Sequence, residues 1–298
     1  MTPRAGIAAG AALALAGAVP WLVGPYGLTI ALNAAMWVAL TVSWSILGGT
    51  AAYISLGHVA FYGLGAYVVV TSWQVLPLVV AVPLGGLVAG AFALTIGWPV
   101  LRVRGPYFVI LTLGIAELVK YAVLNVEAAL GASSRLLFGV PDNRTLYLAT
   151  LGLAVLAIIV AALVRRSRLG AGLVAVREDE VTAETIGVPI GRYKVFAFAL
   201  SAVIPGMVGG LMALRSAYFE PLQVFNPVIS FTIVTMAVVG GAADARGPIL
   251  GALLLVVVSE LLWANAPQGY MIALGVLLIG FVVFAPGGIT GALARPRP

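Results

Sequence analysis

The sequence contains a long segment, from Ala5 to Leu101, without a single Asp, Glu, Lys or Arg. A water-soluble domain cannot accommodate such a segment, because its surface needs charged groups and its helices need polar faces. A lipid bilayer removes that need, and about 20 apolar residues are enough for one transmembrane helix. The segment therefore predicts roughly four membrane spans joined by short turns.

The composition of the whole chain supports the same class. Hydrophobic residues make up 62% of the chain and charged residues only 9%, whereas a typical soluble domain has about 25% charged residues. The net charge of +6 does not indicate nucleic-acid binding, because the basic residues lie between apolar segments rather than along one surface. The absence of cysteine excludes disulfides and thiolate metal sites. We predict an all-α polytopic membrane protein with one transmembrane domain, residues 1–298.

Apolar stretches between glycines, prolines and charged residues predict ten transmembrane helices. The first stretch also resembles a secretory signal, but we expect it to be retained, since further spans follow at once. The longest polar insert, residues 165–194, joins the sixth and seventh spans. The predicted spans run approximately over residues 5–23, 28–47, 53–72, 77–101, 106–125, 145–164, 195–214, 227–243, 248–264 and 270–285.

The basic residues predict the orientation of these spans. Three of them, Arg135, Arg144 and Arg215, fall on one side, while Lys120 lies within a span. The remaining twelve fall on the other side, and the positive-inside rule makes that side cytoplasmic. Both termini and the 165–194 loop are then expected in the cytoplasm. The twelve are Arg4, Arg102, Arg104, Arg165, Arg166, Arg168, Arg177, Arg192, Lys194, Arg246, Arg295 and Arg297.

The cytoplasmic loop is predicted to contain one short helix over residues 179–186. Asp179 is a favourable N-cap, and Glu180 suits the positive end of the helix dipole. Gly187 suits the left-handed position that ends a helix, and Pro189 prevents its continuation. A helix of about eight residues is unstable alone in water. It must be braced by its own spans or by a docked partner, unless the loop is only a solvated connector.

Within the spans, three features carry polar or structural information. Gly57, Gly63 and Gly65 indicate either close helix packing or a helix break that lines a pathway. His58 is the only histidine, and we expect it to be neutral, hydrogen-bonded and structural. Glu117 lies mid-span with Lys120 three residues later, as a structural ion pair or a functional site.

Four segments carry a resemblance to a known family: residues 55–67, 101–117, 177–187 and 239–252. In this order they resemble the Liv-type permeases, and they favour the LivM-like subunit of ABC importers for branched-chain amino acids. The resemblance implies an all-α permease that couples to an ATPase through its cytoplasmic loop. The implied ATPase-coupling residues are Asp179, Glu180, Val181, Ala183, Glu184, Ile186 and Gly187. The implied pathway or packing residues are Ser55, Gly57, His58, Phe61, Gly63, Gly65, Thr112, Glu117, Gly240 and Gly241. The sequence departs from the family at Tyr53 and Ile54, where a glutamine is usual.

The sequence also constrains the energy source. A phosphate-binding loop needs Gly-Lys followed by Ser or Thr, but Lys120 and Lys194 follow Val119 and Tyr193. The chain is therefore expected to bind no cofactor and not to be an enzyme, with ATP used by separate subunits. The resemblance implies two cytoplasmic ATPase subunits, a second, LivH-like permease, and an external solute-binding protein. It also implies the inner membrane of a prokaryote.

The expected solute is a branched-chain or other apolar amino acid, with urea or a short amide as the alternative within the family. An ion-coupled secondary transporter would carry more acidic residues within its spans than Glu117. A membrane-embedded enzyme would need clustered nucleophiles, acids or metal ligands, which this chain lacks.

Overall fold

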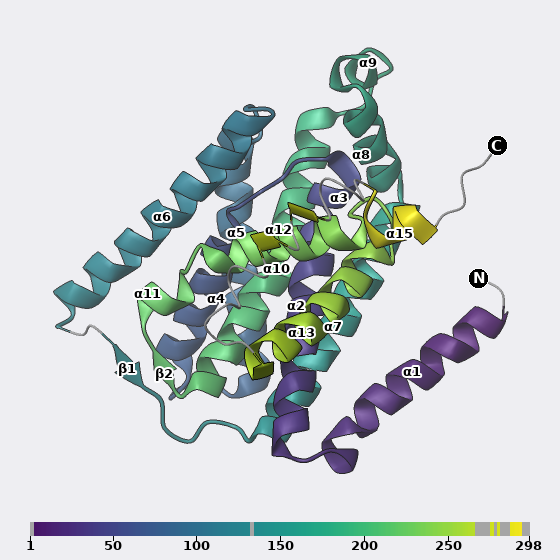
Figure 1. The fold of residues 1–298 in the computed structure, drawn as a ribbon. Coiled ribbons are helices and arrows are strands. Elements are labelled where there is room, and N and C mark those ends of the chain that lie inside the picture. Colours follow the sequence, from purple (N-terminus) through teal and green to yellow (C-terminus); the bar gives the residue numbers. More distant parts are fainter. Residues whose placement is uncertain (1–2, 132–133, 266–274, 277–278, 281–286, 294–298) are drawn as a thin grey trace.

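The computed structural model describes residues 3–131, 134–265, 275–276, 279–280 and 287–293. Most of them are helical (Figure 1). In chain order the elements are α1 (Pro3–Leu22), α2 (Pro25–Ser45), α3 (Gly48–Ala51), α4 (His58–Ser72), α5 (Leu78–Val100), α6 (Pro106–Ala129), β1 (Arg135–Leu136), α7 (Asn143–Arg166), α8 (Arg168–Glu178), α9 (Glu180–Thr185), α10 (Ile190–Ser216), β2 (Tyr218–Phe219), α11 (Pro221–Val224), α12 (Val228–Gly240), α13 (Gly247–Asn265) and α15 (Gly288–Leu293).

The helices confirm the prediction of an all-α polytopic membrane protein. Each predicted span from 5–23 to 248–264 overlaps a helix. Among the described residues, six helical segments are long and apolar enough to cross a bilayer: α2, α5, α6, α7, α10 and Pro221–Gly240. Three apolar helices, α4, α13 and the second half of α1, are shorter. The predicted span 270–285 lies, apart from four residues, outside the described part of the chain.

Helix α10 forms the centre of the bundle. It packs most extensively on α5 and α4 and also contacts α2, which α7 covers in turn (Figure 1). The crossing of α4 and α10 requires glycine, because a Cβ atom added to Gly65 would lie 2.0 Å from the carbonyl oxygen of Gly206. Close backbone approach of this kind is typical of helix packing in membranes, where small residues replace the hydrophobic driving force.

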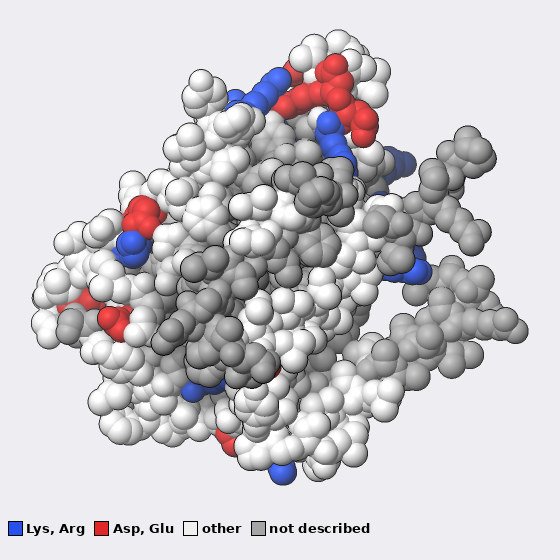
Figure 2. Space-filling view, viewed as in Figure 1, with Lys and Arg blue, Asp and Glu red and all other residues white. Residues whose placement is uncertain are grey.

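The loop segments with most of the basic residues meet at one end of the bundle. Arg177 donates a hydrogen bond to the carbonyl oxygen of Gly49, and Arg165 donates one to that of Ala243. Arg104 and Lys194 both form ion pairs with Glu180 at the same end. Charged side chains accordingly gather around α9 in the space-filling view (Figure 2).

At the opposite end, two short strands join connections that are far apart in the sequence. Arg135 and Leu136 of β1 pair antiparallel with Phe219 and Tyr218 of β2. No sequence pattern predicted this pair, because each strand is only two residues long. The pair ties the α6–α7 connection to the residues that follow α10 (Figure 1).

Two predictions were wrong: the residue at which the span 53–72 becomes helical, and the number of helices in the loop 165–194. The predicted span 53–72 becomes helical only at His58, because Ala52 adopts a left-handed backbone conformation with φ of 58° and the chain stays irregular up to Gly57. The loop 165–194 contains two helices rather than one. Residues 168–178 form the additional helix α8, whose first turn is capped by the Ser167 hydroxyl.

Candidate functional site: a helix break and the loop helix α9

The irregular segment 52–57 is a helix break. Side chains of three other helices bond to its backbone or to the backbone of the first turn of α4 that follows it. Trp44 Nε1 of α2 donates to the carbonyl oxygen of Ser55 at 2.9 Å. Thr112 Oγ1 of α6 accepts from the backbone N–H of Leu56 at 3.1 Å. Ser230 Oγ of α12 accepts from the N–H of Val59 at 2.9 Å. Irregular backbone at membrane depth is stable only where such partners exist.

Ser55, Gly57 and Thr112, three of the predicted pathway or packing residues, meet at this break. The Ser55 hydroxyl accepts a hydrogen bond from the N–H of Gly57 at 3.2 Å. A Cβ atom on Gly57 would lie 3.2 Å from the carbonyl oxygen of Thr112, so a larger residue would push α6 away. The break and α6 are therefore fitted closely to each other.

His58 and Phe61 lie just beyond the break and are both fully buried. Their rings meet edge to face with centroids 5.6 Å apart, and Phe61 also contacts Phe198 of α10 in this way. The prediction that His58 is hydrogen-bonded was wrong, since neither ring nitrogen has a partner among the described residues. The reason is that the His58 ring packs against Phe61, while the Ser55 and Ser230 hydroxyl groups bond to backbone N–H groups.

Gly63 and Gly65 make close packing contacts. A Cβ atom on Gly63 would lie 2.2 Å from the ring of Phe225, as close as the contact of Gly65 with α10. Gly240 and Gly241 form the sharp connection between α12 and α13. Gly241 has φ of 100°, and a Cβ atom on Gly240 would lie 1.9 Å from the carbonyl oxygen of Gly247.

The predicted caps of the loop helix are present. The Asp179 carboxylate accepts hydrogen bonds from the backbone N–H groups of Val181 and Thr182, at 2.8 and 3.0 Å. These bonds lower the pKa of Asp179. Gly187 has φ of 86°, the left-handed conformation expected after the helix. The last helical residue of α9 is Thr185, one residue earlier than predicted.

Helix α9 has one buried and one exposed side. Ala183 is buried against the bundle, whereas Val181 in the helix and Ile186, the residue that follows its last turn, are 63% and 71% exposed. Glu184 is exposed as well. The exposed side therefore offers two apolar side chains next to a carboxylate at the basic end of the molecule.

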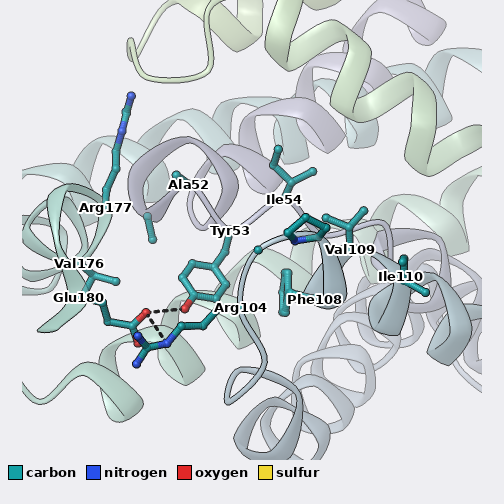
Figure 3. Close-up of a pocket in the computed structure, with 13 residues that line it drawn as sticks. Ala52, Tyr53, Ile54, Arg104, Phe108, Val109, Ile110, Val176, Arg177 and Glu180 are labelled. Atoms are coloured by element: carbon teal, nitrogen blue, oxygen red, sulfur yellow. Dashed lines mark hydrogen bonds and ion pairs between the residues drawn. The ribbon is translucent and has the colours of Figure 1, made fainter.

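Glu180 points inward and is the centre of a polar cluster at the base of α9. Its carboxylate lies 2.6 Å from Lys194 Nζ at the start of α10 and 3.1 Å from Arg104 Nε in the α5–α6 connection. It also accepts a hydrogen bond from the Tyr53 hydroxyl at 2.7 Å (Figure 3). Lys194 donates further bonds to Tyr53 Oη and to the carbonyl oxygen of Leu101.

The electrostatics of this cluster favour the charged form of Glu180. Burial alone would raise the pKa of Glu180, but hydrogen bonds from Lys194 and Tyr53 and the charges of Lys194 and Arg104 outweigh it, so the pKa is lowered. The sequence interpretation placed Glu180 at the helix dipole and did not identify Tyr53, Arg104 or Lys194 as its partners. One feature of the sequence could have revealed these partners. Lys194 lies at the entrance of an apolar span, and a buried cation needs an anionic partner.

A pocket of about 630 Å³ lies beside this cluster. Its wall is formed by the helix break, the start of α6, and helices α8 and α9, with Ile54, Val109 and Glu180 among the lining residues (Figure 3). Tyr53 belongs both to the cluster and to the break, so it connects α9 to the segment that Ser55 and Thr112 hold in place. The pocket, the break and α9 thus form one continuous region.

Glu117 does not belong to this region. Its side chain pairs with Lys120 of the same helix, as one interpretation of the sequence expected. The pair occupies the middle of α6, and the Glu117 side chain is 35% exposed.

A family model described as "Branched-chain amino acid transport system / permease component" matches residues 26–285. The chain belongs to this family. The permease is 30% identical to the high-affinity branched-chain amino acid transport system permease protein LivM of Escherichia coli, over 96% of this chain and 75% of that protein. The LivM protein of Salmonella typhimurium matches equally, and the LivH protein of that organism is 23% identical over 87% of this chain and 91% of its own length. No solved structure shows a significant match to the permease.

Proposed function

We propose that this chain is a LivM-like permease subunit of an ABC importer that translocates branched-chain amino acids. The observation that carries the proposal is the match to LivM over nearly the whole chain. The geometry supports it, because a helix break between α3 and α4 adjoins a pocket and a protruding loop helix.

The proposal includes ten spans with both termini in the cytoplasm of a prokaryotic cell, in its inner membrane. Supporting it, the segments with Arg104, Arg165, Arg177 and Lys194 meet at one end of the bundle, as the positive-inside rule requires of a cytoplasmic end. The predicted span 270–285 would be the tenth.

The exposed side of α9 is the proposed docking point for a cytoplasmic ATPase. Val181 and Ile186 would fill an apolar groove of the ATPase, and Glu184 would pair with a basic residue at its rim. A displacement of α9 would pull on Glu180, and Glu180 would transmit it through Tyr53 to the helix break. The remaining proposed partners are a second, LivH-like permease, a second ATPase and an external solute-binding protein.

Reconstitution tests this function. The chain is expressed with the second permease, the ATPase subunits and the binding protein, and uptake of labelled leucine and labelled urea into proteoliposomes is measured. We expect leucine uptake that requires ATP and every subunit. Uptake of urea without uptake of leucine would show that the solute is urea rather than a branched-chain amino acid. Uptake by the purified chain alone, driven by an ion gradient, would instead identify a secondary transporter and overturn the proposal.

The docking role of α9 is tested separately with the variant Val181→Asp/Ile186→Asp. Two carboxylates on an apolar contact are expected to abolish copurification of the ATPase subunits. The matched control is Leu136→Asp, since Leu136 is similarly exposed at 66% but lies at the opposite end. Equal recovery of the ATPase with both variants would show that α9 does not contribute to the docking surface.

A further inference from the structure

Helix α6 has an exposed face along most of its length. Tyr107, Ile110, Gly114, Leu118 and Tyr121 recur every three or four residues and are all exposed, so they lie on one side of the helix. Only 28% of the most apolar stretch of α6 is buried inside the molecule, whereas 72% of the corresponding stretch of α10 is buried. In Figure 1, α6 accordingly lies at the edge of the bundle.

A charged pair borders this face in the middle of α6, a helix long and apolar enough to cross a bilayer. Glu117 is the twelfth residue of a helix of 24 residues, and it pairs with Lys120. Lys120 Nζ lies 5.1 Å from the ring centre of Tyr121, which is part of the face. A carboxylate has more acceptor sites than one ammonium group occupies, and lipid chains cannot bond to the rest. An ion pair at this depth is expected to face protein or a water-filled cavity rather than lipid.

Gly114 lies on the same face, one turn before Leu118. A Cβ atom added to Gly114 would meet nothing within 4 Å, in contrast to Gly65, where the backbone of α10 fills the space. The fold of this chain therefore does not require glycine at position 114. An exposed glycine in a membrane helix allows the backbone of another helix to approach closely.

We propose that this face of α6 binds the second permease subunit of the importer. A helix of that subunit crosses α6 at Gly114 and supplies a polar side chain to Glu117. Soluble ATPase and solute-binding subunits cannot reach the middle of a membrane span, and lipid chains cannot bond to the Glu117 carboxylate. Another membrane protein is therefore the expected occupant of this face. The inference rests on the proposed function, which requires a second permease.

Site-specific cross-linking tests the contact in the complete importer. A photo-reactive phenylalanine derivative replaces Leu118 on the α6 face, or Ile159 on α7 as the control; both positions are exposed, at 67% and 49%. We expect cross-links to the second permease from position 118 and none from position 159. Lipid adducts alone, or cross-links between two copies of this chain, at position 118 would overturn the proposal.

A pair of glycine variants supplies a second measurement. Gly114→Leu is expected to reduce the amount of copurified second permease about tenfold, because the leucine side chain holds the two helices apart. Gly152→Leu is the matched control, since Gly152 is an exposed glycine within α7 that also has open space around it. Among the described residues, neither Cβ meets an atom within 4 Å, so both variants should fold.

The two proposals fail in distinguishable ways. If the wild-type complex shows ATP-dependent uptake but Gly114→Leu retains the second permease and position 118 gives no cross-link to it, the α6 contact is wrong and the importer function stands. If the wild-type chain recovers neither a second permease nor an ATPase, the importer function is itself wrong, and this contact is rejected with it.

Discussion

Glu180 in the loop helix α9 and Lys194 at the start of α10 form a buried ion pair with an oxygen-to-nitrogen distance of 2.6 Å. Their side chains are only 11% and 5% exposed. The Tyr53 hydroxyl bonds to both of them, so the pair also fixes the segment before α4. This contact is the direct link between the surface of the basic end and the interior of the bundle.

The first prediction concerns the free energy of this pair. Glu180→Gln leaves Lys194 buried without an anion, and we expect the free energy of unfolding to fall by about 3–5 kcal/mol. The measurement is titration with SDS in mixed micelles. Glu184→Gln is the control, because it makes the same chemical change on the exposed side of α9 and should have little effect. The double variant Glu180→Gln/Lys194→Met should recover most of the loss, since it removes both charges.

The second prediction is a pH dependence. The pKa of Glu180 is lowered in the folded protein, so its carboxylate binds a proton less readily when folded than when unfolded. The stabilisation is therefore complete above the unfolded value, about 4.3, and is lost as the pH falls through the lower folded value. Wild type and Glu180→Gln should differ most above about pH 5 and converge in acid. A difference that grows as the pH falls would contradict this assignment.

The third prediction concerns the helix break. Thr112→Val removes the acceptor for the N–H of Leu56, and Ser230→Ala removes the acceptor for the N–H of Val59. Each should lower the free energy of unfolding by about 1–3 kcal/mol, because a buried backbone donor is left without a partner. Thr232→Val is the control, since the Thr232 hydroxyl bonds only to the carbonyl oxygen of Val228 in its own helix. Equal stability of all three variants would mean that the break does not need these hydroxyl groups.

The fourth prediction concerns the crossing of α4 and α10. Gly65→Ala places a methyl group 2.0 Å from the carbonyl oxygen of Gly206, and the two backbones must separate. We expect a loss of about 1–3 kcal/mol or more, as for other overpacked interiors. Gly152→Ala, with nothing within 4 Å, should be neutral or slightly stabilising, since alanine favours the helix. Thermal unfolding in detergent compares the two.

The helical fold was largely predictable because it follows from apolar length. The run from Ala5 to Leu101 and the spacing of charges give most span positions to within a few residues. The caps of α9 were predictable for a similar reason. Asp179 and Gly187 act on neighbouring backbone groups, so their roles depend only on local sequence.

The partners of the site residues were not predictable in this way. Tyr53 and Glu180 are separated by 127 positions, and their hydrogen bond depends on how α9 lies against the bundle. The glycines near the break suggested either packing or a discontinuity; the structure has both, the discontinuity at residues 52–57 and packing at Gly63 and Gly65. The left-handed conformation of Ala52 carries no sequence signal, since alanine is rarely found there.

The strand pair β1–β2 has a mechanical consequence. Two backbone segments joined in register cannot slide or separate without losing their ladder bonds, and Arg135 of β1 is also bound to Glu127 at the end of α6 by two hydrogen bonds of 2.7 and 2.8 Å. The C-terminal ends of α6 and α10 are therefore joined by hydrogen bonds, at the end of the molecule remote from α9. We therefore expect a displacement of one of these helix ends to be passed to the other through β1 and β2.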